Sequence, residues 1–403
     1  MKHIILLCDG MADEPFEGLE NATPMERANK PHMDALAAKA ELGTVKTVPD
    51  TLSPGSDVAN LSVMGYNTEE CYTGRSPLEA ANIGIDLKDT DVAFRCNLVT
   101  LSDEVDYTEK TMVDYCADDI STAEADELIK AVQEAFGNEQ FAFYTGTNYR
   151  HCMVWHGGKS LSCKLTPPHD ITGKPIRAHL PADPEVMVLL GMMACSYEVL
   201  KNHPVNVARV ERGLRPANSI WLWGQGKRPQ LADFKAKNGV SGSVISAVDL
   251  LKGIGRIANM NVCEVEGATG YIDTNYAGKT AAAIAELERG QDLVYLHFEG
   301  PDECGHRGEA QNKVKAIEDI DKLCLQPLLA YLRNAGEFDI LILPDHPTPL
   351  SIRTHDRAPV PYLLYRSYRE QESGAESFTE AAARATGICI DPGYTLLNRL
   401  LEK

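Results

Sequence analysis

An aspartate and a histidine four residues apart are the first candidates for chemistry in this sequence. Asp302 and His306 stand in the segment DECGH, and His355 follows in RTHD. A carboxylate and two imidazoles can close on one divalent cation, and Gly305 lets the backbone turn tightly between the first two. The DxxxH spacing taken alone is more often a solvated helix end, so this interpretation needs support from other residues.

A second set of ligand types provides that support. Asp9 follows one apolar run, and Asp345 and His346 follow another. Together they offer a mixed oxygen and nitrogen site suited to manganese, zinc or magnesium. A single aspartate in such a place is more often a turn or helix-capping residue, but the coincidence of several at strand ends favours a metal site.

Ser56 lies in the segment SPGSDVAN, just before the apolar residues 61–64. One interpretation is a helix N-cap, a position that serine commonly takes. The other is a nucleophile whose hydroxyl is acidified by a metal and whose phosphorylated form is stabilised by backbone N–H groups at the helix start. The two interpretations are compatible.

Buried strands must position these groups. Three short apolar runs, each followed by an acidic loop, predict strands, and apolar residues at three- and four-residue spacing predict helices between them. Alternating strands and helices predict an α/β fold with a mostly parallel sheet covered by helices on both faces. Ligands gather beyond the carboxyl ends of such strands, so Asp9, Asp302 and Asp345 are expected in one region. The predicted strands are 2–8, 293–298 and 340–343, and the predicted helices are 31–40, 279–289 and 311–332.

The middle of the chain has a different texture. Short alternating runs at 93–100 and 141–144 and a proline-rich stretch at 166–184 predict a separate α+β domain. We expect this inserted domain at residues 89–267, with residues 1–88 and 268–403 forming one discontinuous domain. A chain of 403 residues is long enough for two such cores.

Composition narrows the function further. A formal charge of −19 argues against non-specific binding to nucleic acid or to an anionic membrane, because both require a basic surface. The N-terminus is too short and too quickly acidic for a signal peptide, and no run of about 18 apolar residues occurs. We therefore predict a cytoplasmic protein, while the sequence favours no particular oligomeric state. The eleven cysteines include no CxxC pair and are expected to be reduced thiols in the core. Cys304 lies inside a candidate metal motif, so a reactive thiol is the alternative interpretation of that residue.

Five further segments follow one another along the chain: PGSDVANLSVMGYN, GRSPLEAANIGI, DECGHRGE, PDHPTP and RTHDRAPVPYLLY. With these segments in this order and spacing, essentially the whole chain resembles the archaeal-type cofactor-independent phosphoglycerate mutases of the alkaline-phosphatase superfamily. The resemblance implies an alkaline-phosphatase-like domain, an inserted substrate-binding domain and a cleft between them.

Carried over by position, the resemblance implies two divalent cations, manganese first, with zinc, magnesium or cobalt as alternatives. Ser56 becomes the phosphoryl acceptor and shares one cation with Asp9, Asp345 and His346. The other cation is expected on Asp302, His306 and His355. The substrate is then a small phosphorylated anion, bound by basic residues that include Arg75, Arg150, His151, Arg212 and Lys279.

One segment departs from the family pattern. Where the mutases are expected to carry an arginine, the segment IWLWGQGKRP places Trp223. This variant resembles a subgroup proposed to act as alternative homoserine kinases, although no Walker-type glycine-rich loop is present. The tryptophan is otherwise a plain core residue.

The sequence therefore predicts metal-dependent interconversion of 2- and 3-phosphoglycerate, a step of glycolysis and gluconeogenesis, through phosphorylated Ser56. Homoserine phosphorylation is the first alternative, and phosphomonoester hydrolysis is the second, because it differs only in letting water reach the phosphoserine. A binding or scaffold protein that has lost turnover is the non-enzymatic alternative. It is disfavoured because every candidate ligand position and the nucleophile position hold suitable residues.

Overall fold

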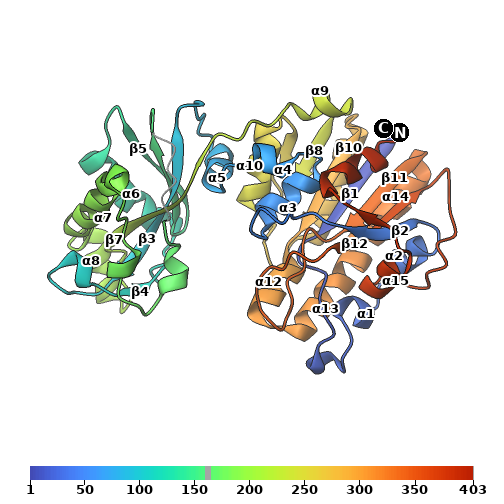
Figure 1. Ribbon diagram of the computed structural model, residues 1–403, viewed down its shortest axis with the longest axis horizontal. Coiled ribbons are helices and arrows are strands. Elements are labelled where there is room, and N and C mark those ends of the chain that lie inside the picture. The colour runs from blue at the N-terminus through green and yellow to red at the C-terminus, as the bar shows by residue number, and fades with distance from the viewer. Residues whose placement is uncertain (159–164, 403) are drawn as a thin grey trace. The chain divides into compact units, whose positions relative to one another are not determined.

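The computed structural model describes residues 1–158 and 165–402 and forms two compact units, which Figure 1 shows as ribbons. Unit 1 consists of Met1–Tyr72 and Gln230–Lys403, and unit 2 of Thr73–Pro229. The sequence placed these boundaries near residues 88 and 268, and both lie earlier in the structure. The first lies earlier because the helix Ser76–Asn82 packs against the sheet of unit 2. The second boundary lies earlier because the strands within residues 230–267 pair into the sheet of unit 1, and those short strands give no marked apolar run.

Unit 1 is built on an eight-stranded sheet. Its strand order is β13-β2-β12-β11-β1-β10-β8-β9. Strand β12 runs antiparallel to both of its neighbours, and all the other neighbouring strands are parallel. The strands are β1 (Lys2–Cys8), β2 (Glu41–Val45), β8 (Gly242–Ile245), β9 (Asn261–Cys263), β10 (Leu293–Phe298), β11 (Phe338–Leu343), β12 (Val360–Arg366) and β13 (Cys389–Ile390). The predicted mostly parallel α/β sheet is confirmed.

Helices pack against both faces of this sheet. Alternate residues of β1, such as Ile4 and Leu6, join one apolar cluster with α2 (Pro31–Ala37), α11 (Tyr276–Glu288), α13 (Ala310–Asp319) and α14 (Gln326–Ala335). The opposite face is covered by α3 (Ser56–Val63), α10 (Asp249–Ile257) and α16 (Leu396–Leu400). Burial on both faces explains why the central strands read as continuous apolar runs rather than as alternating ones. Further helices of unit 1 are α1 (Pro24–Arg27), α4 (Thr68–Cys71), α9 (Phe234–Asn238), α12 (Gly300–Arg307) and α15 (Glu380–Ala385).

The predicted elements of unit 1 agree with the observed ones to within a few residues. The helix expected at 311–332 is continued as α13, a π-helical segment at Ile320–Leu325 and α14. One wide helical turn of this kind does not disturb the apolar spacing enough to be read from sequence.

Unit 2 is an antiparallel sheet with helices packed against it, as expected for an α+β domain. The strand order is β4-β3-β6-β5, and β7 pairs with β3. The strands are β3 (Val92–Leu101), β4 (Met112–Asp114), β5 (Phe141–Thr147), β6 (Arg150–Trp155) and β7 (Ser219–Lys227). The helices are α5 (Ser76–Asn82), α6 (Thr122–Phe136), α7 (Met187–Leu200) and α8 (Pro204–Glu211).

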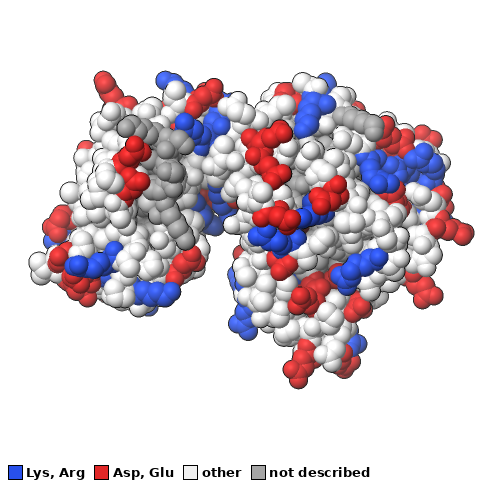
Figure 2. Space-filling view, in the orientation of Figure 1, with Lys and Arg blue, Asp and Glu red and all other residues white. Residues whose placement is uncertain are grey.

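The surface charges and the cysteines can be compared with what the amino-acid composition predicts. Figure 2 shows acidic side chains interspersed with basic ones on the drawn face of both units. The ten described cysteines are free thiols, and seven of them are buried. Burial raises the pKa of Cys304 to about 12, which favours the core interpretation of that residue. Over the described part of the chain, no helix combines the length and apolar character that crossing a bilayer would require.

Candidate functional site

The three acidic residues expected beyond strand ends do lie at one edge of the sheet in unit 1. Asp9 directly follows β1, and Asp345 stands two residues beyond β11. Asp302 lies in the first turn of α12, which follows β10. Strand β1 pairs in parallel with both β10 and β11, so the three chain segments leave the sheet at the same carboxyl edge.

Asp9, Asp345 and His346 form the first cluster of candidate ligands. One ligand atom from each of the three lies within 4.8 Å of the others, and all three side chains are buried. Nε2 of His346 is 3.7 Å from Oδ1 of Asp9 and 3.4 Å from Oδ2 of Asp345. Ser56 joins this cluster, because its Oγ lies 3.1 Å from Nε2 of His346.

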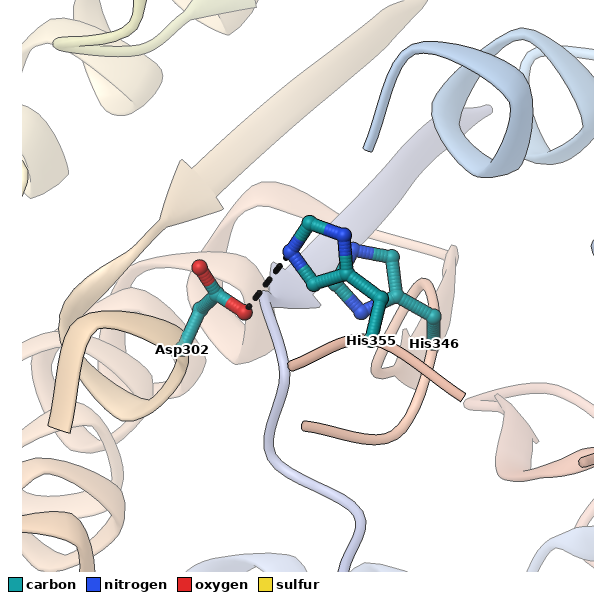
Figure 3. A group of neighbouring side chains, drawn as sticks. All are labelled: Asp302, His346 and His355. Carbon is teal, nitrogen blue, oxygen red and sulfur yellow. Dashed lines mark ion pairs between the residues drawn. The ribbon is translucent and has the colours of Figure 1, made fainter. Parts of the chain in front are cut away.

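Asp302 and His355 form the second cluster, and His346 lies within reach of it as well. Figure 3 shows the carboxylate of Asp302 directed at the ring of His355, with an ion pair of 3.6 Å between Oδ1 and Nε2. The His346 and His355 ring centroids are 4.1 Å apart. Nε2 of His306 is 3.2 Å from Oδ2 of Asp302 and 3.0 Å from Nε2 of His355. The structure thus brings together all seven residues predicted as ligands and nucleophile, with His346 between the two groups.

The neighbouring carboxylates of Asp9, Asp345 and Asp302 repel one another unless positive charge lies between them. Burial raises the pKa of Asp9 well above its usual value, and the neighbouring charges of Asp345 and Asp302 raise it further. Among the described residues, Oδ1 of Asp9 has no hydrogen-bond partner although it is fully buried. A buried, unpartnered carboxylate oxygen beside an imidazole and a second carboxylate fits a bound divalent cation. The residues present therefore fit the two cations expected from the sequence.

The pKa values in the second cluster shift in different directions. Burial would raise the pKa of Asp302, but the hydrogen bond from His306 and the nearby imidazoles hold it below its usual value. That hydrogen bond raises the pKa of His306 to about 9. Burial and the adjacent His346 lower the pKa of His355 to about 4. Without a cation, one proton thus stays between Asp302 and His306, and a cation that binds there must displace it.

Local backbone geometry explains the glycine that follows Asp9. Gly10 has φ +61°, and a Cβ there would lie 2.6 Å from Cα of Asp302. Its backbone N–H donates to Oδ1 of Asp345 at 3.2 Å, and the N–H of His346 donates to the same oxygen at 2.9 Å. A glycine is therefore required directly after Asp9 for the two loops to approach each other.

Thr348 is a contributor that the sequence reasoning missed. Its hydroxyl donates to Oδ1 of Asp302 at 2.5 Å and lies 3.3 Å from Nδ1 of His346. Since the hydroxyl proton goes to Asp302, the Nδ1 proton of His346 is directed at the Thr348 oxygen. Nε2 of His346 is then left as a lone pair facing Ser56 and the clusters. The position of Thr348 directly after Asp345-His346-Pro347 was the only sequence signal that could have indicated a role in the site.

In unit 2, Arg75 and an arginine that was not predicted share one glutamate. Nε of Arg75 and Nε of Arg95 each lie 2.9 Å from a carboxylate oxygen of Glu79. Burial would raise the pKa of Glu79, but the charges of Arg95 and Arg75 outweigh that effect and lower it, and Arg150 adds to the lowering. Three arginines around one carboxylate leave this cluster with excess positive charge, as an anion site requires.

The other three residues predicted to bind substrate have different surroundings. His151 is buried and accepts a hydrogen bond from the N–H of Gly146, and burial lowers its pKa to about 3. Arg212 pairs with Glu124 rather than with Glu79. In unit 1, Lys279 is buried, donates to the carbonyl of His297 at 2.7 Å, and has a pKa lowered by burial to about 8.

Trp223, which marks the departure from the family pattern, packs against the arginine cluster. The guanidinium of Arg95 lies 4.3 Å from the centroid of its ring, and its Nε1 donates to Oδ1 of Asn97 at 3.0 Å. The indole is almost fully buried. The residue is thus part of the core, as the second interpretation expects, and it also packs against Arg95.

Together these observations define the class. The protein is an α/β enzyme whose candidate centre for two divalent cations lies at the carboxyl edge of a mostly parallel sheet, with a serine at a helix start beside it.

Comparison with known proteins gives the family. A family model described as 2,3-bisphosphoglycerate-independent phosphoglycerate mutase matches residues 37–206. The chain is 50% identical, over the full length of both, to a probable 2,3-bisphosphoglycerate-independent phosphoglycerate mutase of Geobacter sulfurreducens. It is 48% identical, again over the full length of both, to the mutase of that name in Methanosarcina barkeri. The chain belongs to the family of 2,3-bisphosphoglycerate-independent phosphoglycerate mutases, as its motifs predicted.

Solved structures agree with this assignment. A protein from Pyrococcus horikoshii superposes with a TM-score of 0.81 at 28% identity, covering 100% of this chain and 97% of that one. The cofactor-independent phosphoglycerate mutase of Thermoplasma acidophilum superposes with a TM-score of 0.65 at 25% identity, covering 100% and 99%.

Proposed function

We propose that this chain interconverts 2-phosphoglycerate and 3-phosphoglycerate through a phosphorylated Ser56, with two divalent cations held by the two clusters of unit 1. The observation that carries the proposal is the position of the Ser56 hydroxyl, 3.1 Å from the histidine that lies between the two clusters. A nucleophile placed there can use both cations. The names of the relatives support phosphoglycerate as the substrate.

In the proposed cycle, Oγ of Ser56 forms a bond to the phosphorus of 3-phosphoglycerate as the bond between phosphorus and O3 of the glycerate breaks. O3 takes up a proton, and the phosphoryl group stays on the serine. The glycerate then turns, O2 attacks the phosphoserine, and 2-phosphoglycerate leaves with Ser56 protonated again. No second phosphorylated substrate is consumed.

The residues of the chain have separate tasks in this cycle. Ser56 is the first residue of α3, so a phosphoryl group on it would lie at the N-terminal end of the helix, where the helix dipole favours negative charge. Nε2 of His346 is unprotonated and 3.1 Å from Oγ of Ser56, so the cation that it binds would lie within reach of that oxygen. Bound cations would lower the cost of forming the serine alkoxide and neutralise charge on the transferred group. Asp9, Asp345 and His346 would hold one of them, and Asp302, His306 and His355 the other.

We further propose that Arg75, Arg95 and Arg150 bind the carboxylate or phosphate of the substrate. Glu79 keeps Arg75 and Arg95 in defined positions, which reduces the entropy lost when an anion binds. Manganese is the first cation that we propose, with zinc, magnesium or cobalt as alternatives; the mixed carboxylate and imidazole ligands are compatible with it. The proposed substrates are cytoplasmic metabolites, so we propose a cytoplasmic enzyme.

The test is a paired assay on one purified, manganese-loaded sample. Phosphoglycerate interconversion is followed without nucleotide, and phosphohomoserine formation is followed with homoserine and ATP. Mutase turnover that Ser56→Ala abolishes supports the proposal, and phosphate release from 3-phosphoglycerate would instead indicate a phosphomonoesterase. Product formed only from homoserine and ATP would overturn the proposal in favour of the kinase alternative.

A further inference from the structure

Strand β10 carries two polar side chains inside a run that reads as apolar, LVYLHF. Tyr295 and His297 stand two residues apart, so both point to the same face of the sheet. Both are fully buried. Polar groups that are removed completely from water need partners, and each of these two leads to a different carboxylate of the Ser56-side cluster.

The contacts of His297 determine which of its nitrogens carries the proton. The N–H of Val248 donates to Oγ of Ser246 at 2.9 Å, so the hydroxyl proton of Ser246 is available to Nδ1 of His297, 3.0 Å away. Nε2 of His297 then carries its proton and donates to Oδ2 of Asp9 at 2.8 Å. This hydrogen bond occupies one oxygen of the Asp9 carboxylate. The other oxygen, Oδ1, faces His346 and has no hydrogen-bond partner in the described part of the chain.

Tyr295 reaches the second carboxylate through an amide. Its hydroxyl lies 2.5 Å from Oδ1 of Asn60. Nδ2 of Asn60 donates to Oδ2 of Asp345 and to the backbone carbonyl of Ser56, both at 2.8 Å. Because both amide protons go to oxygens, the amide can be oriented only this way, and Tyr295 must be the donor to its carbonyl. One buried amide thus connects the first turn of the nucleophile helix with a candidate ligand.

We propose that Tyr295 and His297 are positioning residues, which hold Asp345 and Asp9 in the orientation that receives the cation beside Ser56. The inference rests on the two-cation centre of the proposed function and adds to it a support made by one strand. The polar atoms of both side chains already have protein partners, so neither residue is a ligand in this proposal. Their alternative role is packing alone, which would affect stability without affecting the affinity of one ion.

The experiment measures Mn²⁺ binding to chelator-stripped protein by calorimetry, and the magnetic coupling of bound Mn²⁺ by electron paramagnetic resonance. His297→Leu removes the N–H donor, His297→Gln keeps one, and Tyr295→Phe removes a single oxygen. Loss of a residue that orients a ligand typically weakens metal binding by about 10- to 100-fold. We expect His297→Leu to weaken the binding of one of the two ions to this extent, and Tyr295→Phe to weaken the binding of the same ion by about tenfold. At limiting Mn²⁺, both variants should lose the spectrum of two coupled Mn²⁺ ions. His297→Gln should recover much of the affinity.

Two matched controls lie on the same sheet. His3→Leu breaks a buried histidine–carboxylate pair, Nδ1 to Oδ2 of Asp339 at 3.0 Å, near the start of β1. Tyr362→Phe removes a hydroxyl that donates to Glu41 at 2.6 Å. Both should bind two Mn²⁺ ions as the wild type does, even where they lower stability.

The inference is overturned if His297→Leu and Tyr295→Phe bind both ions with wild-type affinity, or if the controls weaken an ion equally. Should His297→Leu not fold, the same decision rests on Tyr295→Phe and its control. Wild-type protein that binds fewer than two ions would instead contradict the two-cation centre of the proposed function. Two ions bound equally by wild type and variants would contradict only the inference.

Discussion

The two units assemble their charged groups in opposite ways. In unit 1, four stretches of chain far apart in sequence meet at one sheet edge and bury acidic groups and imidazoles in a closed network. In unit 2, Arg75 and Glu79 lie one turn apart at α5, and Arg95 joins them from the adjacent strand β3. The charged groups at this edge of unit 1 have excess negative charge, and the arginine cluster of unit 2 has excess positive charge.

This difference suggests a division of labour. A buried acidic centre can be satisfied only by cations, and its ligands must be held precisely for phosphoryl transfer. In the proposed function, the partly exposed arginines of unit 2 recognise the substrate anion, and part of their charge is already balanced by Glu79. Changes in unit 1 should therefore affect kcat or metal content, and changes in unit 2 should affect KM.

The largest expected effect is at Ser56. Ser56→Ala should reduce mutase turnover by about four orders of magnitude or more, because no other group can accept the phosphoryl group. The measurement is a ³¹P NMR or enzyme-coupled assay of phosphoglycerate interconversion. Ser62→Ala, on the same helix, is the control and should stay within a few-fold of the wild type. Substantial turnover by Ser56→Ala would break the assignment of chemistry to unit 1.

Asp302→Asn should have the next largest effect. The substitution removes a carboxylate charge from the second cluster and the partner of His306. We expect kcat to fall by about two to three orders of magnitude and one of the two Mn²⁺ ions to be lost. Metal content after gel filtration and kcat are both measured. An unchanged stoichiometry of two ions would place the second cation elsewhere.

Arg75→Met tests the role assigned to unit 2. A charge-assisted hydrogen bond to substrate contributes about 1.5–3 kcal/mol, so KM should rise roughly 10- to 100-fold while metal content stays at two ions. Arg212→Met should raise KM less, because Arg212 pairs with Glu124 and not with the Glu79 cluster. Arg177→Met, which breaks a pair with Glu109, serves as the surface control. A fall in kcat alone for Arg75→Met would contradict the division.

The smallest expected effect is the acid stability of unit 2. The pKa of His151 is lowered by burial to about 3, below the value of about 6.5 expected in the unfolded chain. The unfolded state therefore binds the extra proton first, and the stability contributed by neutral His151 is present above pH 6.5 and lost as pH falls towards 3. The slope from this one residue is at most about 1.4 kcal/mol per pH unit.

Tryptophan fluorescence isolates this effect, because the three tryptophans, at positions 155, 221 and 223, all belong to unit 2. Urea unfolding of His151→Gln should depend less on pH between 6.5 and 4 than that of the wild type. His179→Gln is the control from the same unit. An unchanged pH slope in His151→Gln would mean that another group dominates acid unfolding.

Several structural features could be predicted because they depend on local pattern. The runs at β1, β10 and β11 are apolar on both faces, which is typical of central parallel strands, and each ends in acidic residues. The rule that ligands gather at the carboxyl edge was then enough to bring Asp9, Asp302 and Asp345 together. The motifs in order identified the family.

Other features were misjudged because they depend on partners distant in sequence. The domain boundary near residue 268 was placed too late, since β8 and β9 are short and are recognised as strands only by pairing beside β10. Arg95 reads as a single polar residue in an alternating strand, and only the packing of α5 on β3 brings it to Glu79. His151 reads as a polar residue near Arg150, but its strand buries it.

The sequence by itself determined the class of elements, the family and the seven candidate residues of the metal centre, because residue type and local periodicity are enough for these. Only the tertiary structure decided which histidine lies between the two clusters and which tautomer it adopts. The tertiary structure also revealed the hydrogen bonds from His297 to Asp9, from Tyr295 to Asn60 and from Asn60 to Asp345, on which the proposed orientation of the carboxylates rests. The physical reason is that hydrogen-bond direction at a buried site depends on the register of neighbouring strands, and the register is set by the packing of the whole sheet.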